Sequence, residues 1–158
     1  MRLVDLISEE VIRPSLAGAT KAAVIDELID ALVQAGQVAP EARERVAKAV
    51  HQREASHTTG LGSGVAVPHG VSDQVDQVVG ALGIHREGVD FAAVDGAPVH
   101  LVILLVVPPN MFQAHIRTLA GVARVLNDPG LRRQLMAATQ PEAVMTILGE
   151  REGALEPI

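Results

Sequence analysis

Cysteine is absent from this chain, which excludes disulfide bonds, thiolate metal sites and cysteine nucleophiles. Tryptophan and tyrosine are also absent, and phenylalanine occurs only at Phe91 and Phe112. A surface that stacks nucleic-acid bases or sugar rings needs aromatic side chains, so this shortage argues against both kinds of surface. The core must instead be built from leucine, valine, isoleucine and alanine.

Basic side chains are too few for a nucleic-acid or anionic-membrane partner. There are 13 Lys and Arg residues against 19 Asp and Glu, the formal net charge is −6, and no block of basic residues occurs. The longest apolar run, Leu101–Val107, is far too short to span a bilayer. Glu9 and Glu10 follow the N-terminus too closely for a signal peptide, so we expect a cytoplasmic protein without membrane insertion.

The remaining composition is that of one globular domain. The chain has 158 residues, of which 48% are apolar, which is enough for one core and too little for two comfortable domains. We expect a single domain over residues 1–150, followed by a frayed C-terminal tail at 151–158. The apolar pattern predicts helices between Thr20 and Gly36, from Pro40 to about Arg53, and over Gln113–Leu126, Leu131–Ala138 and Pro141–Leu148.

Strands are predicted between these helices. Leu3–Ile12 is interpreted as a lead-in turn and an edge strand, and Val65–Val67 and Val78–Ile84 as short strands. Val99–Val107 is apolar on both faces, as expected of a central strand that helices cover on both sides. Residues 85–96 are expected to form a connection with a short extended piece. The predicted fold is therefore α/β, a single-domain sandwich in which a small mixed β-sheet is flanked by helices on both faces.

The candidate chemistry is concentrated in the stretch Thr58–Gly70, TTGLGSGVAVPHG. Its alternate glycines lack Cβ, so the loop can take positive φ and turn N–H groups toward an anion. Pro68 restrains the strand end that follows, which holds the imidazole of His69 in place. The stretch has neither the Gly-Lys-Ser/Thr of a P-loop, nor the third glycine of a dinucleotide fingerprint, nor the spacing of a nucleophile elbow. By spacing alone, an ordinary glycine turn with a surface histidine fits equally well.

The same stretch, preceded by Arg53-Glu54, resembles the active-site signature of the enzyme IIA domains of the fructose/mannitol class. These domains belong to the bacterial phosphoenolpyruvate-dependent sugar phosphotransferase system, and the nitrogen-regulatory IIA proteins share the signature. The resemblance continues in Val99–Pro108 and Ala114–Ile116 and covers nearly the whole chain. The chain departs from the family pattern at positions 57 and 58, where small residues are common, and at position 116, where leucine is usual.

The resemblance implies that His69 carries a phosphoryl group on a ring nitrogen, Nε2. Imidazole is largely neutral near pH 7 and has a free lone pair, which suits this role. The resemblance also implies that His115, at the start of a helix, is a second active-site histidine and that Arg53 binds phosphate oxygens. If the family resemblance is set aside, a histidine at the position of His115 would more often pack against the sheet. Arg53 would then be interpreted as a solvated side chain at a helix end. Further candidates for binding the phosphoryl group are Thr59, Gly62, Ser63 and Gly64.

The implied partners are the phosphocarrier protein HPr as donor and a IIB domain or subunit as acceptor, in the uptake of a sugar or sugar alcohol. The transfer itself needs no cofactor and no metal. Alternatively, in a nitrogen-type regulatory protein, the phosphorylation of His69 would control binding to partner proteins. A third alternative is a domain that keeps the fold without the chemistry. The joint presence of His69, His115 and Arg53 counts against the third alternative, but it does not separate the first two.

A shallow apolar rim is expected around His69, because donor and acceptor must both reach one imidazole. We expect it to be drawn from the glycine loop and from Met111-Phe112, although Phe112 could equally fill the core. The other histidines, at positions 51, 57, 85 and 100, are weaker candidates for chemistry. A zinc site among them is disfavoured, because no His-x-His or His-x-x-x-His pair occurs.

Overall fold

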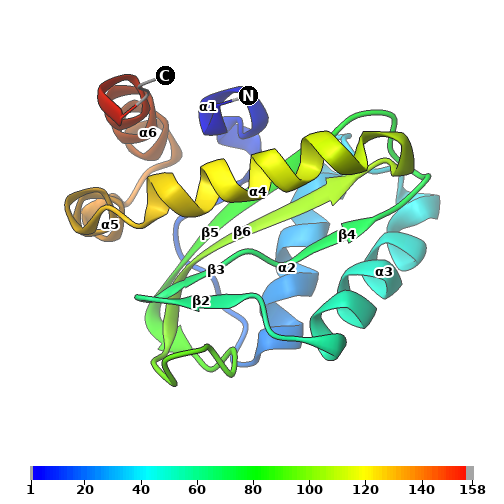
Figure 1. Cartoon of the computed structure of the whole chain (residues 1–158), viewed down its shortest axis with the longest axis horizontal. Coiled ribbons are helices and arrows are strands. Elements are labelled where there is room, and N and C mark those ends of the chain that lie inside the picture. The colour runs from blue at the N-terminus through cyan, green and yellow to red at the C-terminus, as the bar shows by residue number, and fades with distance from the viewer. Residues whose placement is uncertain (1, 156–158) are drawn as a thin grey trace.

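A mixed sheet of six strands runs through the centre of the protein in the order β1-β5-β6-β3-β2, and β4 also pairs with β6 (Figure 1). The computed structural model describes residues 2–155, excepting the side chains of residues 112, 114 and 152–155. The strands are β1 (Ile12–Arg13), β2 (Gly60–Gly62), β3 (Val65–Ala66), β4 (His69–Val71), β5 (Val79–Val89) and β6 (Val99–Val107). The α-helices are α1 (Leu3–Leu6), α2 (Lys21–Gln34), α3 (Arg43–Ser56), α4 (Phe112–Leu126), α5 (Pro129–Ala137) and α6 (Pro141–Leu155). The short 3-10 helices are η1 (Glu9–Val11), η2 (Pro40–Ala42) and η3 (Pro109–Met111).

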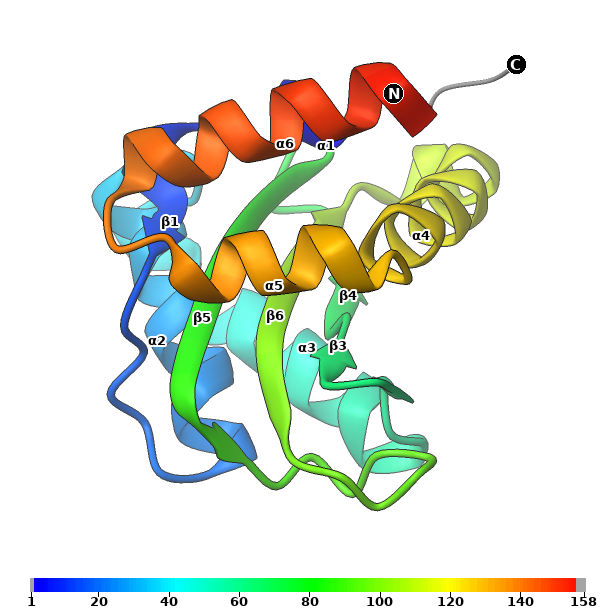
Figure 2. The ribbon, with the colours of Figure 1, turned by 90° about the vertical axis from the view of Figure 1, so that its left-hand side faces the viewer.

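Helices cover both faces of the sheet, which confirms the predicted fold class. α2 and α3 lie on one face, whereas α4 and α5 cross the other, with α6 and α1 beside them (Figures 1 and 2). α2 begins after Thr20, whose side chain accepts a hydrogen bond of 3.2 Å from the Ala23 amide. It ends before Gly36, which has a φ of 77° and closes the helix as the sequence predicts.

The central strand is β6, and it contributes most to the core. Only His100 among its nine residues is not buried. β5 pairs with it in antiparallel orientation, with an irregularity between Ile84 and Val89. The prediction that this strand ends at Ile84 is wrong, because β5 continues to Val89. Gly88, with a φ of 92°, allows the irregular segment to rejoin the pairing.

The other edge of β6 carries the segment that contains His69. In β3, Val65 pairs with Leu101 in parallel orientation, and in β4, His69 pairs with Leu105. The difference in residue number between paired residues is the same for β3 and β4. Residues 65–71 therefore run along β6 as one extended segment with a constant register. Pro68 interrupts this line because it has no N–H, but its carbonyl accepts a hydrogen bond of 3.0 Å from the Leu105 amide. Among the described strands β4 pairs with β6 alone, so His69 lies at an edge of the sheet.

The two ends of the described chain contain more helix than the sequence predicts. The lead-in to β1 contains α1 and η1. α6 continues to Leu155, into the segment expected as a tail, because it packs against α1, η1, β1 and α5. Residues 156–158 of that expected tail lie outside the described part of the chain. None of the described helices combines the length and apolar character that crossing a bilayer requires.

Gly70 sets the separation between β4 and α3. A Cβ at this position would lie 3.0 Å from the backbone nitrogen of Val50 and 3.2 Å from the carbonyl carbon of Ala49. Backbone atoms of a helix cannot rotate away, so we expect Gly70→Ala to lower the free energy of unfolding by about 1–3 kcal/mol, measured by urea denaturation. The matched control is Gly121→Ala in α4, where a Cβ meets no atom within 4 Å. That variant should be about 0.5–1 kcal/mol more stable than the wild type. If Gly70→Ala were as stable as the wild type, β4 would have to be free to move away from α3.

Candidate active site

His69 lies half-buried at the start of β4, and the backbone holds its ring. Its Nδ1 is 2.9 Å from the carbonyl oxygen of Val67. A carbonyl oxygen can only accept a hydrogen bond, so Nδ1 carries the proton and Nε2 keeps a lone pair in the neutral ring. Burial and the charge of Arg53 lower the pKa of His69, while the Val67 carbonyl and Glu54 act in the opposite direction. At pH 7 the ring is therefore neutral, and Nε2 is the nucleophilic atom.

His115 lies in the first turn of α4, directly against His69. The two ring centroids are 5.0 Å apart, and the ring planes are inclined at 58°. Only 2% of His115 is exposed. Burial and the neighbouring His69 lower the pKa of His115 to about 4. His115 is thus a neutral hydrogen-bonding group at pH 7 rather than a cation.

A cavity of about 550 Å³ opens between α3 and α4 beside these two rings. Arg53, near the end of α3, also lines it, so the structure brings together three residues that the sequence singles out: Arg53, His69 and His115. The guanidinium of Arg53 donates a hydrogen bond of 2.7 Å to the carbonyl of His57, which fixes one end and leaves other N–H groups available. The cavity therefore combines a nucleophilic nitrogen, a neutral imidazole and a cation.

Apolar side chains line this cavity and reach solvent. Val71 is 40% exposed and Ile116 is 51% exposed, and Leu119 lies beside them. The helical spacing in the sequence predicts that Ile116 lies on the same apolar stripe as Leu119. The structure shows that Ile116 nevertheless faces solvent, which the spacing does not reveal.

The glycine loop does not contribute to this rim, since its Leu61 lines a different cavity. Met111, which is also expected at the rim, does not line this cavity. The side chain of Phe112 lies outside the described part of the structure.

Thr59 and the residues Gly62–Gly64 do not line the His69 cavity. The hydroxyl and the N–H of Thr59 donate to the carboxylate of Glu54 at 2.5 and 2.8 Å. Ser63 and Gly64 have φ values of 58° and 81°, as required at the centre of the tight turn between β2 and β3. The N–H of Ser63 donates to the carboxylate of Asp95 at 3.0 Å, so the anion at this loop is one of the chain's own side chains. A role for these residues in binding a phosphoryl group stays a prediction.

Glu54 has a role that the sequence does not reveal. Its buried carboxylate accepts from Thr59 and also from Nζ of Lys21, at 3.0 Å. Burial raises the pKa of Glu54, but the hydrogen bonds from Thr59 and Lys21 outweigh this effect and lower it. The charged carboxylate connects the end of α3 to Lys21 at the start of α2 and to Thr59 just before β2, and this holds the backbone of the adjacent Arg53 in place. Within the described residues, no group of three or more His, Cys, Asp or Glu side chains could hold a metal ion.

Known proteins are similar to this chain in sequence and in fold. A nitrogen regulatory protein of Bradyrhizobium diazoefficiens is 32% identical over 148 residues, which are 94% of this chain and 95% of that protein. The crystal structure of nitrogen regulatory protein IIA-Ntr from Neisseria meningitidis has a TM-score of 0.83 and 31% identity, covering 92% of this chain and 98% of that one. Enzyme IIAMtl of Escherichia coli, in a complex with phosphorylated enzyme IIBMtl, has a TM-score of 0.76 and 27% identity, covering 92% of this chain and 99% of that one.

A further relative is much longer than this chain. The fructose-specific EIIABC component of Bacillus subtilis is 28% identical over 152 residues, which are 96% of this chain but 24% of that protein. The family model described as "Phosphoenolpyruvate-dependent sugar phosphotransferase system, EIIA 2" matches residues 5–151. The match takes in the whole sheet and the cavity between α3 and α4. This chain therefore belongs to the EIIA 2 family of the phosphoenolpyruvate-dependent sugar phosphotransferase system.

Proposed function

We propose that this protein is a phosphoryl carrier, which accepts a phosphoryl group from HPr on Nε2 of His69 and passes it to a IIB component. The observation that carries the proposal is the hydrogen bond from Nδ1 of His69 to the carbonyl of Val67. It leaves Nε2 as the unprotonated nitrogen of a ring that lines an open cavity. Membership of the EIIA 2 family supports the same conclusion.

In the loading step, the lone pair of Nε2 forms a bond to phosphorus while the bond between phosphorus and the donor's ring nitrogen breaks. The electron pair of the broken bond stays on the donor nitrogen. The proton on Nδ1 of His69 stays in its hydrogen bond with Val67, where the carbonyl dipole stabilises the positive charge that develops on the ring. Negative charge spreads over the phosphoryl oxygens, and Arg53 and the neutral His115 supply donors to them. In the transfer to the IIB component, a nucleophilic atom of IIB forms a bond to phosphorus while the bond between phosphorus and Nε2 of His69 breaks. The electron pair of that bond returns to Nε2, which restores the neutral ring.

Two features support a transport role. IIAMtl, to which this chain is similar, is known in a complex with phosphorylated IIBMtl. The exposed Val71 and Ile116 also provide an apolar surface beside His69 on which a IIB component can dock transiently.

A regulatory role is the second candidate, because nitrogen regulatory proteins match this chain over nearly their full length. In that role a phosphoryl group would add a charge of about −1.5 to −2 beside the same apolar surface and change its affinity for a partner. Mixing the phosphorylated protein with a IIB component of a fructose or mannitol permease distinguishes the transport role from the regulatory role. Rapid loss of the phosphoryl group supports transport, and its retention supports regulation.

Phosphorylation with phosphoenolpyruvate, enzyme I and HPr tests the carrier function. We expect one phosphoryl group per chain by intact mass spectrometry, with a linkage that is labile to acid and stable to alkali. His69→Ala should abolish loading and leave the circular dichroism spectrum unchanged, because the ring is only half-buried at a sheet edge. His57→Ala, which alters an exposed histidine, is the matched control and should load like the wild type. Loading of the His69→Ala protein would rule out His69 as the carrier.

His115→Ala, which removes the ring and its N–H donor, tests whether His115 stabilises the phosphoryl group during transfer. Loss of one positioned donor in an active site costs about 2.7–4 kcal/mol, so we expect transfer rates to fall by about 10²–10³-fold while some phosphorylation persists. Rapid-quench measurement of loading from HPr and of transfer to the IIB component gives both rates. Wild-type rates in both directions would reduce His115 to a packing residue.

The lowered pKa values of both histidines link folding to pH. The contribution of each to stability is complete above the ordinary histidine pKa of 6.5 and is lost as the pH falls below it, because the unfolded chain binds these protons first. For His115 this loss continues down to its lowered pKa of about 4. We expect the free energy of unfolding to fall between about pH 7 and pH 5, by up to about 1.4 kcal/mol per pH unit for each histidine. Urea denaturation at each pH measures this slope. The slope should be smaller in His115→Gln, and equal slopes would contradict the lowered pKa of His115.

A further inference from the structure

A second groove lies where α4 and α5 meet the turn between β2 and β3. It consists of two adjoining cavities of about 660 and 410 Å³, and Ser63 and Arg132 line both of them. The groove lies toward the opposite end of β6 from His69. The pairs Val65–Leu101 and His69–Leu105 are separated by four residues of strand, which is about 13 Å. The groove is thus separate from the cavity of His69.

Three arginines line this groove. Arg133 lines the larger cavity, Arg124 the smaller, and Arg132 stands between them. Among the described side chains none of the three forms an ion pair, although the chain has 19 acidic residues against 13 basic ones. By contrast, Arg43 and Arg151 both pair with aspartates. Three cations without a counter-charge around one groove favour an anionic ligand.

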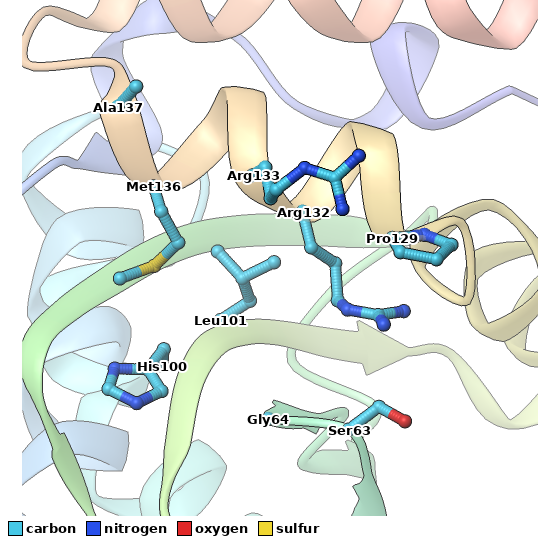
Figure 3. A pocket seen from close by; sticks show the side chains of 9 residues that line it. All are labelled: Ser63, Gly64, His100, Leu101, Pro129, Arg132, Arg133, Met136 and Ala137. Carbon is cyan, nitrogen blue, oxygen red and sulfur yellow. The ribbon is translucent and has the colours of Figure 1, made fainter.

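The guanidinium of Arg132 is already held in position. It donates one hydrogen bond of 2.9 Å to the carbonyl of Leu126 at the end of α4, which leaves its other N–H groups available. Figure 3 shows its side chain extending from α5 toward Ser63. A planar guanidinium opposite a hydroxyl suits the oxygens of a phosphate group, since both can donate to them.

Both walls of the groove are anchored. The N–H groups of Ser63 and Ala97 donate to the carboxylate of Asp95, which fixes the turn that presents Ser63. Asp95 itself lines neither cavity. On the other wall, the guanidinium of Arg86 donates to the carbonyls of Met136 and Ala138 and holds the end of α5 against β5. The groove is therefore formed before any ligand arrives.

The larger cavity has an apolar part next to the cationic part. Leu101 and Met136 line it, and the side chain of Met136 extends toward His100 (Figure 3). Nδ1 of His100 is 2.9 Å from the carbonyl of His85, so the imidazole ring is fixed as a flat surface. The volume of about 660 Å³ falls within the range of about 300–1,000 Å³ that is typical of sites for small organic molecules. A flat, apolar body attached to a phosphate fits both parts.

We propose that this groove binds a nucleoside monophosphate, with the phosphate between Arg132 and Ser63 and the base against Met136 and Leu101. Arg124 and Arg133 add attraction from either side of the phosphate. The inference does not depend on phosphoryl transfer at His69, because His69, His115 and Arg53 line a separate cavity.

Titration of the ¹⁵N-labelled protein with AMP, followed by amide chemical shifts, tests this proposal. The amides of Ser63, Gly64, Arg132 and Arg133 should shift at millimolar AMP, while those of His69 and Gly70 should not. Adenosine and inorganic phosphate, which each lack one half of the ligand, should bind at least about tenfold more weakly. Shifts confined to the His69 cavity, or none in the groove, would overturn the proposal. Inorganic phosphate that binds as tightly as AMP would overturn the assignment of a nucleoside.

Variants then identify the cations that hold the phosphate. Arg132→Gln should weaken AMP binding by about tenfold or more, as loss of a charge-assisted hydrogen bond does. Arg133→Gln removes an exposed side chain without a hydrogen bond inside the described chain, so it should fold normally and weaken binding several-fold. Arg45→Gln, on the exposed side of α3, makes the same change in net charge and should bind AMP like the wild type. Equal affinity in all three variants and the wild type would overturn the proposal.

Discussion

The hydrogen bond between Nδ1 of His69 and the carbonyl of Val67 decides which ring nitrogen can react. It depends on the parallel pairing of residues 65–71 with β6, because that pairing sets the direction of the Val67 carbonyl and the position of the ring. Pro68 restricts the backbone between Val67 and His69, and the Leu105 amide donates a hydrogen bond to the carbonyl of Pro68. A buried central strand thus aligns the imidazole, and the edge position of β4 leaves it within reach of other proteins. Much of the remaining fold serves to keep β6 buried and β4 against α3.

The site around His69 contains one permanent positive charge and two imidazole rings that are neutral at pH 7. His69 and His115 lie 5.0 Å apart, and burial disfavours a charge on either ring. Arg53 supplies the permanent positive charge, while Glu54 is turned away into its own cluster with Thr59 and Lys21. A phosphoryl group bound to His69 would favour the protonated forms of nearby groups, because opposite charges raise the pKa of an imidazole. The loaded site would then hold more positive charge than the empty one.

α4 connects two regions with different chemistry. Its first turn places His115 against His69, and its last turn places Arg124 and the Leu126 carbonyl at the arginine-lined groove. Nitrogen regulatory and sugar-specific IIA proteins share the fold around His69, so that region alone does not separate transport from regulation. A ligand in the groove would contact the turn at Ser63, which leads directly into β3 and β4.

The sequence by itself determined the central strand Val99–Val107, the main helices and the position of His69 just after Pro68, because apolar periodicity, caps and proline restraints act over short stretches. The proximity of His115 and Arg53 to His69 was implied only by the resemblance to IIA domains. Three features are determined by the tertiary structure alone. The Thr59 hydroxyl donates a hydrogen bond to Glu54, the amide of Ser63 donates one to Asp95, and Ile116 faces solvent. Glu54 is only five residues before Thr59, but Lys21, 33 residues away, also binds its carboxylate. Asp95 is 32 residues from Ser63, and the exposure of Ile116 depends on which surfaces other segments cover. A glycine-rich loop has the same local pattern whether it binds a phosphoryl group or closes a tight turn, and only the packing of distant segments separates the two.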